Sequence, residues 1–238
     1  MTETAATPTP TLSIGLLLFP DLTQLDLTGP YEVFARMPGV RVRLIWKTRD
    51  PVVSDRGMAL VPDTTFDDCP PLDILCIPGG PGQIDLMEDD ETLAFVRRIA
   101  AGCRFVTSVC TGSLVLGAAG LLRGYRATSH WASRDQLALL GAQPVEARVV
   151  FDRNRVTGGG VTSGIDFALA LVAHLYGDAA AQRIQLQLEY DPAPPFHSGS
   201  PASAPPAILA EARQGMAPML ARRLAATRAA AARFEASA

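Results

Sequence analysis

The sequence predicts an α/β protein in which helices cover both faces of a parallel sheet. Segments typical of buried strands alternate along the chain with segments typical of helices, which is the pattern of parallel strands joined by helical crossovers. The 238 residues are 48% hydrophobic and 19% charged, a length and composition that suit one large packed core. No internal repeat is visible, so one domain with a C-terminal helical extension is the simplest interpretation.

Apolar runs mark the expected strands. Ser13–Leu18 is a short apolar run that ends at Phe19-Pro20, and Val40–Trp46 alternates apolar with polar residues as a half-buried strand does. The remaining strands are expected at Ile74–Ile77 and Phe105–Val109, and at Arg148–Phe151 and Arg155–Thr157, which would pair across Asp152–Asn154.

Helices are expected between these strands. The first opens at Thr28-Gly29-Pro30 and runs to about Arg36, with Thr28 as its cap and Pro30 in its first turn. Glu91–Ala101 is amphipathic and turns Leu93, Val96 and Ile99 inward. The others are expected at Thr111–Ala119, at Trp131–Leu140 ended by Gly141, from a Thr162/Ser163 cap to about Tyr176, at Gln182–Leu188, and from Ile208 onward. His174 lies among apolar residues and is predicted to be in the core.

The chain divides into three stretches. Residues 1–11 are rich in Thr, Ala and Pro and lack the basic and apolar regions of a signal peptide, so they are interpreted as a disordered leader. Residues 12–189 hold the alternating strands and helices. Residues 190–238 begin with a segment containing six prolines and continue as an Ala/Arg-rich helix, which we expect to pack on the same domain.

Composition excludes several classes of function. The net charge is −3, whereas nucleic-acid and anionic-membrane binding favour a basic face. No apolar stretch reaches the roughly 20 residues that a bilayer needs. The four cysteines form no C-x-x-C pair and lack metal-type histidine spacing, so neither a metal site nor structural disulfides are predicted for a chain expected in the cytoplasm.

The sharpest local feature is Cys110, which follows the Phe105–Val109 strand and immediately precedes a helix. This strand–turn–helix arrangement is that of a nucleophile elbow. The positive end of the helix would stabilise a thiolate. Position alone leaves two interpretations open, a reactive thiol or a small buried residue.

Two further segments follow strands in the same way. Pro78-Gly79-Gly80-Pro81-Gly82 comes directly after Ile74–Ile77, where glycines allow close backbone approach and can aim N–H groups at a developing anion. It lacks the spacing of a phosphate loop or a dinucleotide fingerprint. Asp26 lies between two leucines after the first strand, and is either a helix cap or a catalytic acid whose ionisation burial disfavours.

Together these segments resemble the class I glutamine-amidotransferase-like superfamily and its PfpI-type cysteine proteins. The resemblance covers Leu12 to about Leu188 and implies a flavodoxin-like sheet, with Cys110 as nucleophile, Asp26 as the nearby carboxylate, and Gly79 and Gly80 as backbone oxyanion donors. Two departures matter. Thr111 occupies the position of the histidine in PfpI-type proteases, and Asp26 stands where many members have Glu.

A narrower resemblance accommodates both departures. Four runs and the tail Gly199-Ser200-Pro201 are similar to the isonitrile (isocyanide) hydratases; the runs are Gln24–Pro30, Ser108–Leu122, Gly158–Leu169 and Gln185–Pro195. The match spans nearly the whole chain and implies that a hydro-lyase adds water to an isonitrile and releases an N-substituted formamide. It also implies that no metal or organic cofactor takes part, and that the chain forms a homodimer for which the C-terminal helix is a reasonable interface.

The chemistry of the residues is compatible with this activity. A soft thiolate at Cys110 can attack the terminal carbon of an isonitrile if an acid protonates that carbon, and Asp26 is suited to move the proton. Thr111 would orient rather than take the proton, because a hydroxyl is a poor base. A backbone N–H near Val161 is expected to donate to the thiolate, and the helix that follows Gly158-Gly159-Gly160 to shift when that charge is lost.

Two other functions remain open from the sequence. The Cys-Thr-Gly-Ser and Gly-Gly-Gly regions also resemble the sensor domains of AraC-type regulators, which bind small ligands without catalysis. Only about 30 residues follow the Pro-rich segment, fewer than a helix-turn-helix DNA-binding domain requires. Aldehyde chemistry of the glyoxalase type also uses a reactive cysteine and a carboxylate.

Overall fold

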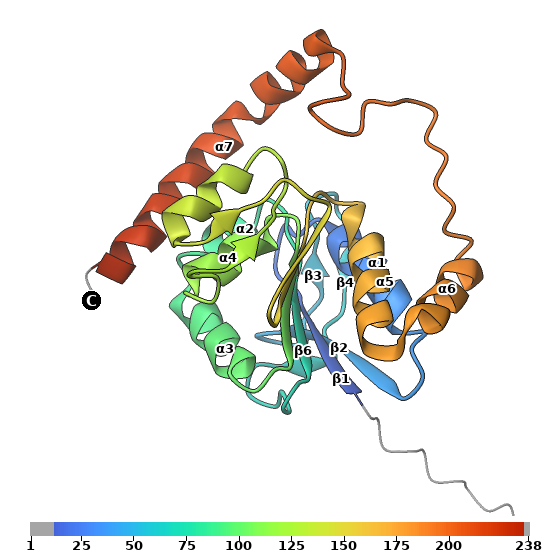
Figure 1. The fold of residues 1–238 in the computed structure, drawn as a ribbon. Coiled ribbons are helices and arrows are strands. Elements are labelled where there is room, and N and C mark those ends of the chain that lie inside the picture. The colour runs from blue at the N-terminus through green and yellow to red at the C-terminus, as the bar shows by residue number, and fades with distance from the viewer. Residues whose placement is uncertain (1–11, 236–238) are drawn as a thin grey trace, which may run out of the picture.

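The computed structural model describes residues 12–235 as a sheet between two layers of helices (Figure 1). The sheet has seven strands in these residues, and all neighbours are parallel except β10 and β11. In spatial order they are β10 (Val149–Asp152), β11 (Arg155–Gly158), β7 (Phe105–Val109), β6 (Ile74–Ile77), β1 (Leu12–Leu17), β2 (Val40–Trp46) and β5 (Thr64–Thr65). The five strands from β11 to β2 follow the flavodoxin-like order.

Helices cover both faces of the sheet, as the sequence predicts. One layer contains α1 (Gln24–Phe34), α5 (Ser163–Tyr176) and α6 (Asp178–Gln187). The opposite layer contains α2 (Gln83–Leu86), α3 (Asp90–Ala100), α4 (Gly112–Ala118), the 3₁₀ helix η1 (Arg134–Leu140) and α7 (Pro206–Glu235). Two small sheets complete the description, β3 (Val52–Val53) with β4 (Ala59–Leu60), and β8 (Arg126–Ala127) with β9 (Gln143–Pro144).

The core lies along the central strands. Every residue of β6 and β7 is buried, because helices pack on both faces of a parallel sheet and leave no polar side for alternation. Both strands have the bounds that the sequence predicts, and so does β2. In α3 the expected inward residues Leu93, Val96 and Ile99 are all buried. The apolar runs and the helical periodicity therefore locate the core correctly.

The first helix was predicted too late in the chain. It begins at Gln24, and Thr28 is not its cap, because the Thr28 hydroxyl donates to Gln24 Oε1 within the helix. Pro30 lies inside the helix rather than in its first turn. The early start has a tertiary cause: the N–H of Gly79 donates to the Asp26 side chain at 3.0 Å and fixes the first turn against the loop after β6.

Three further expectations were wrong in detail. The helix predicted at Trp131–Leu140 is only the 3₁₀ helix η1, which packs between α4 and α7 and ends, as expected, at Gly141 with a positive φ of 78°. Thr162 makes no capping bond, because its hydroxyl accepts from Arg148 instead. His174 is exposed, and its ring packs against the rings of Phe105 and Phe151.

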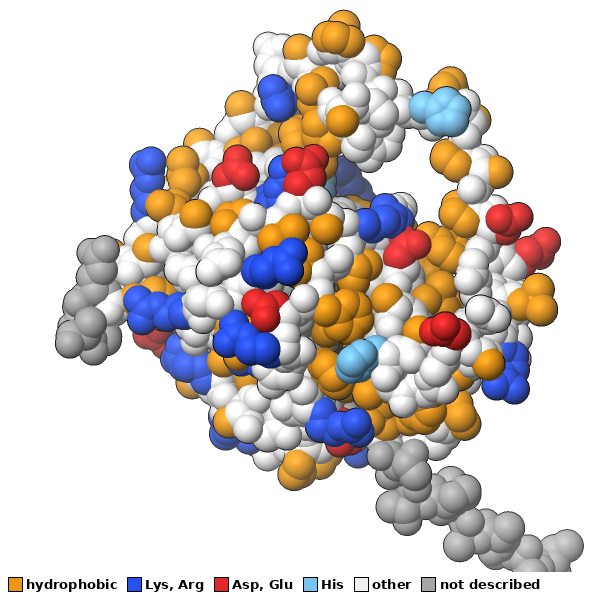
Figure 2. Space-filling model, in the orientation of Figure 1, with side chains coloured by type: hydrophobic (Ala, Val, Ile, Leu, Met, Phe, Trp, Pro, Cys, Tyr) orange, Lys and Arg blue, Asp and Glu red, His pale blue; other side chains and the backbone are white. Residues whose placement is uncertain are grey.

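The segment 190–205 has no helix or strand, and it connects two elements that lie far apart in space. In Figure 1 it leaves the end of α6 and crosses to the start of α7, and in Figure 2 an opening separates it from the body. The second half of α7 packs against α2, α4 and η1, where Arg223, Ala226 and Thr227 are buried. The first half is mostly exposed.

One expectation concerns residues beyond this description. The disordered leader at 1–11 lies outside the described range. Within residues 12–235, no helix combines the length and the apolar character needed to cross a membrane.

Candidate active site

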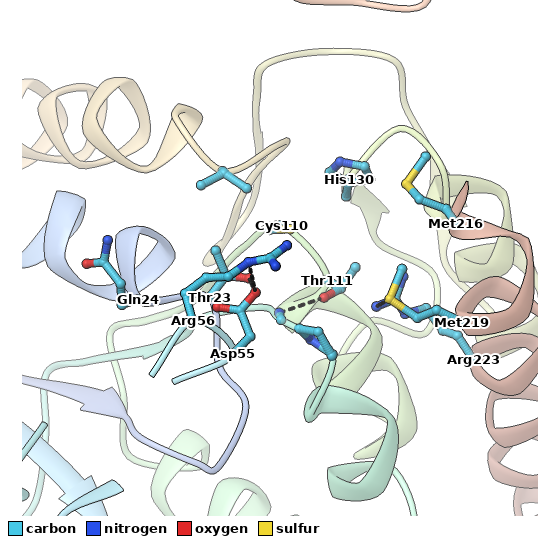
Figure 3. Close-up of a pocket in the computed structure, with 13 residues that line it drawn as sticks. Thr23, Gln24, Asp55, Arg56, Cys110, Thr111, His130, Met216, Met219 and Arg223 are labelled. Carbon is cyan, nitrogen blue, oxygen red and sulfur yellow. Dashed lines mark hydrogen bonds and ion pairs between the residues drawn. The ribbon is translucent and has the colours of Figure 1, made fainter. Parts of the chain in front are cut away.

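A cavity of about 420 Å³ opens at the carboxyl edge of the sheet, where β1, β6 and β7 end. In Figure 3 Gln24, Asp55 and Arg56 lie on one side of Cys110, and Met216 and Met219 lie on the other. Flavodoxin-like folds bind ligands at this edge, beside the point at which the strand order reverses. The cavity therefore lies where the topology favours a site, and it contains the predicted nucleophile.

Cys110 occupies a constrained turn between β7 and α4. Its φ is +56°, a conformation that residues other than glycine rarely adopt and that is concentrated at functional sites. Its N–H donates to the carbonyl of Gly158 at 3.1 Å, and its own carbonyl accepts from the hydroxyls of Ser129 and Ser113 at 3.0 and 3.2 Å. These bonds hold the turn, so the thiol has one defined position beside the cavity.

Gly112 allows the helix after Cys110 to start against the neighbouring strand. A Cβ atom at Gly112 would lie 2.1 Å from the carbonyl oxygen of Ile77, which is far inside van der Waals contact. The close approach brings the start of α4 against the loop after β6.

Asp26 is fully buried in the first turn of α1. One carboxyl oxygen, Oδ2, accepts the N–H of Gly79 at 3.0 Å. The other, Oδ1, has no hydrogen-bond partner among the described residues, so it is free to hold a proton. Burial raises the pKa of Asp26 to about 7, against the lowering effects of the Cys110 side chain and the Gly79 N–H; the charge of Asp55 adds to the increase.

The thiol of Cys110 is coupled to this carboxyl group. Burial raises the pKa of Cys110 well above its ordinary value, and the charge and hydrogen bonding of Asp26 raise it further, while the N–H of Thr111 and the charge of Arg223 lower it. A negative charge on one partner opposes a negative charge on the other, so the two groups titrate as a pair. The first proton lost leaves a single negative charge for both groups.

The two glycines after β6 position Asp26 and Thr111. A Cβ at Gly79 would lie 2.6 Å from the Thr111 nitrogen and 2.8 Å from Asp26 Oδ2, so only glycine fits between them. The N–H of Gly80 donates to the Thr111 hydroxyl at 3.2 Å. Both N–H groups are therefore engaged with side chains of the site. Their expected role as oxyanion donors stays a prediction, and the structure gives them a positioning role.

Val161 lines the same cavity as Cys110 and Thr111. It follows Gly158-Gly159-Gly160 and precedes α5, as the sequence predicts. The backbone N–H that lowers the pKa of Cys110 here belongs to Thr111. Donation from the Val161 N–H, and a shift of α5 during turnover, stay predictions.

The contribution of α7 to the cavity was not predicted from the sequence. Met216, Met219 and Arg223 line the cavity, and their spacing of three and four residues places them on one face of a helix. That spacing is the only sequence feature that could have indicated their shared face. It does not stand out, because the helix around these residues is rich in Ala and Arg. His130 also lines the cavity, while its Nδ1 accepts from the N–H of Ala132; burial and the charge of Arg223 lower its pKa to about 4.

The described residues offer no group of side chains suited to bind a metal ion. Across residues 12–235 no group of three or more His, Cys, Asp or Glu side chains could hold a metal ion. All four cysteines are free thiols.

The sequence profile of the DJ-1/PfpI family matches residues 12–174. This chain belongs to the DJ-1/PfpI family. It is 60% identical over 223 residues to the isonitrile hydratase of Pseudomonas putida, which covers 94% of this chain and 98% of that protein. The crystal structure of a THiJ/PfpI family protein from Pseudomonas syringae aligns over 95% of this chain and 97% of that one, with a TM-score of 0.90 and 44% identity.

A more distant relative is a transcriptional regulator. The HTH-type transcriptional regulator GbdR of Pseudomonas aeruginosa is 31% identical over 75% of this chain but only 51% of its own length. The present chain thus spans about half of that protein. The family membership and the flavodoxin-like fold inferred from the sequence are both confirmed.

The raised pKa of Asp26 predicts how stability depends on pH. Between its ordinary value of 3.8 and about 7, the folded chain binds this proton more tightly than the unfolded chain does. The stabilisation is fully present below the lower value and is lost as the pH rises through about 7, by up to a few kcal/mol. We expect Asp26→Asn, which cannot titrate, to gain stability relative to the wild type over this range.

Urea unfolding at several pH values from about 4 to 7 measures this difference. Asp191→Asn is the matched control, because Asp191 is exposed in the segment 190–205. Parallel stability profiles for the wild type and Asp26→Asn would show that Asp26 is not protonated preferentially in the folded chain.

Proposed function

We propose that this chain hydrates isonitriles, converting R–N≡C and water into an N-substituted formamide. The 60% identity to an isonitrile hydratase over 94% of the chain supports this activity. The structural observation that carries the proposal is the buried Cys110–Asp26 pair at one cavity, which offers a nucleophile and an acid together. The reaction is that of a hydro-lyase.

The first step forms a covalent bond to sulfur. The Cys110 thiolate attacks the terminal carbon of the isonitrile while Asp26 donates a proton to the same carbon, giving the thioimidate R–N=CH–S–Cys110. Because the pKa of Asp26 lies near 7, the carboxyl group can both give and recover a proton at neutral pH. The Asp26 proton and the thiolate both add to the terminal carbon, so Asp26 is left ionised and no oxidant or reductant is needed.

The second step returns the enzyme to its starting state. Ionised Asp26 accepts a proton from water as the water oxygen adds to the thioimidate carbon. Asp26 passes this proton to the nitrogen, the carbon–sulfur bond breaks with its electron pair going to sulfur, and Asp26 takes the remaining hydroxyl proton as R–NH–CHO leaves. One water has been added overall, and Cys110 and Asp26 again share one proton.

The surroundings fit a neutral substrate. Met216, Met219 and Val161 give the cavity apolar walls suited to the substituent R. Thr111 has no acid–base function in this scheme; its hydroxyl, held by the Gly80 N–H, orients groups beside Cys110. We assign substrate contact to Val161 and positioning to Gly79 and Gly80, which hold Asp26 and Thr111 in place.

The homodimer implied by the resemblance is also part of the proposal. Residues 191–200 are exposed throughout. Phe196 in this stretch exposes 76% of its surface, and Ile208 in the first half of α7 exposes 53%. A second copy of the chain would cover these apolar side chains. Light scattering should give about twice the chain mass of 25.2 kDa, and a mass equal to one chain would contradict the dimer.

Removing the nucleophile tests the covalent mechanism. We expect Cys110→Ala and Cys110→Ser to abolish formamide formation from a simple alkyl isonitrile, measured by NMR or gas chromatography, with the fold unchanged by circular dichroism. Cys69→Ala is the control, since Cys69 lies outside the cavity lining. Normal turnover by Cys110→Ala would exclude the thioimidate. Isonitrile binding by the wild type without any formamide would favour the sensor function instead.

Replacing the acid tests proton transfer. Asp26→Asn keeps nearly the same shape and can still accept the Gly79 N–H, but it cannot move a proton. We expect kcat to fall by roughly 10²–10⁴-fold, the usual range for general acid–base catalysis. Asp26→Glu should be impaired less, because the added methylene shifts the carboxyl group but preserves its chemistry. The exposed Asp191→Asn serves as control, and wild-type turnover by Asp26→Asn would reduce Asp26 to a structural residue.

A further inference from the structure

Arg223 is a buried cation in the wall of the cavity that contains Cys110. It belongs to the second half of α7, only 3% of its surface is exposed, and it lines the cavity together with Cys110 and His130 (Figure 3). Arg223 lies more than a hundred positions after Cys110 in the sequence, so only the folded chain brings the two residues to one cavity.

The hydrogen bonds of Arg223 all go to uncharged groups. Its Nε donates to Gln83 Oε1 at 2.6 Å, its Nη1 donates to the Ser133 hydroxyl at 3.0 Å, and its Nη2 lies 3.6 Å from the sulfur of Met219. Among residues 12–235 no carboxylate forms an ion pair with it. Buried charges are normally paired, since an isolated one is costly to remove from water.

The anion that Arg223 can stabilise is a thiolate at Cys110, which lines the same cavity. Burial lowers the pKa of Arg223, and a negative Cys110 raises it; in return, the positive charge of Arg223 lowers the pKa of Cys110. The groups that lower the pKa of Asp26 are the Cys110 side chain and the Gly79 N–H, whereas the charge of Arg223 is among those that lower the pKa of Cys110.

Other charged groups around the cavity do not replace this cation. Asp55 and Arg56 lie on the opposite wall, where Arg56 is 88% exposed and pairs with Asp55 at 3.7 Å. His130 is neutral at pH 7, because burial lowers its pKa to about 4. Among the residues lining the cavity, Arg223 is thus the buried positive charge.

We infer that Arg223 is a positioning residue whose charge shifts the negative charge of the catalytic pair toward Cys110 and the shared proton toward Asp26. This inference rests on the proposed function, which requires a thiolate to attack and a carboxylic acid to donate. In the opposite arrangement, a neutral thiol beside an ionised carboxylate, there is no thiolate to attack the isonitrile and no acid to protonate it. The guanidinium acts through its electrostatic field, and its hydrogen bonds to Gln83 and Ser133 fix its position in the cavity wall.

Alkylation of Cys110 by iodoacetamide tests the inference without any isonitrile. The probe is small and uncharged, and only the thiolate displaces its iodide. We expect Arg223→Met, which keeps much of the length but loses the charge, to slow alkylation of Cys110 about tenfold at pH 7 and to move the pH profile to higher pH. Mass spectrometry of the modified peptide separates Cys110 from the other three cysteines.

Two further variants distinguish charge from packing. Arg223→Lys loses the hydrogen-bond fork but keeps the charge, and should retain most of the wild-type rate. Arg222→Met removes a neighbouring side chain that is 71% exposed and should match the wild type. Equal slowing by Arg223→Lys and Arg223→Met, with melting temperatures compared for both, would show a packing role and overturn the inference.

The remaining outcomes separate this inference from the proposed function. A wild-type rate in Arg223→Met, with Cys110 of the wild type reactive at pH 7, would overturn the role of Arg223 and leave the nucleophile intact. A wild-type Cys110 that reacts no faster than an ordinary buried thiol would overturn both, because no thiolate would be present to stabilise.

Discussion

Burying Asp26 and Cys110 beside each other leaves room for one negative charge between them. Burial disfavours the charged form of both groups, and each makes ionisation of the other harder. The surrounding structure meets this constraint with short backbone contacts rather than with an abundance of charged groups. The Gly79 N–H binds the carboxyl group, and the Thr111 N–H favours the thiolate.

These contacts require a particular sheet edge. Asp26 follows β1, Gly79 follows β6 and Cys110 follows β7, and these strands are neighbours in that order. In a parallel sheet their carboxyl ends lie at the same edge, so three loops from separate parts of the sequence converge without any long excursion. The glycines then determine how closely the loops approach, because a Cβ at Gly79 or Gly112 would overlap neighbouring backbone atoms.

The part of this arrangement that the sequence predicts is the part governed by local pattern. β6 and β7 are buried apolar runs and β2 alternates apolar with polar residues, so all three strands were located to the residue. Cys110 was recognisable from its place between a strand and a helix. The start of α1 was missed because it depends on the distant Gly79 N–H, not on its own capping residues. Arg223 and Met219 were missed because helical spacing does not reveal which cavity a distant helix will face. His174 was misplaced because an apolar neighbourhood in sequence does not fix the face that a helix turns outward.

The late position of α7 has an evolutionary consequence. The family profile ends at residue 174, so the strands and loops that carry Cys110 and Asp26 belong to the shared part of the fold, whereas Met216, Met219 and Arg223 are contributed by a helix beyond it. Substitutions in this appended helix can reshape the wall that faces a substrate while the inherited nucleophile and its carboxyl partner stay unchanged. Selection can thus alter the apolar wall formed by Met216 and Met219 without touching Cys110 or Asp26, whereas Arg223 couples the same helix to the charge of the nucleophile.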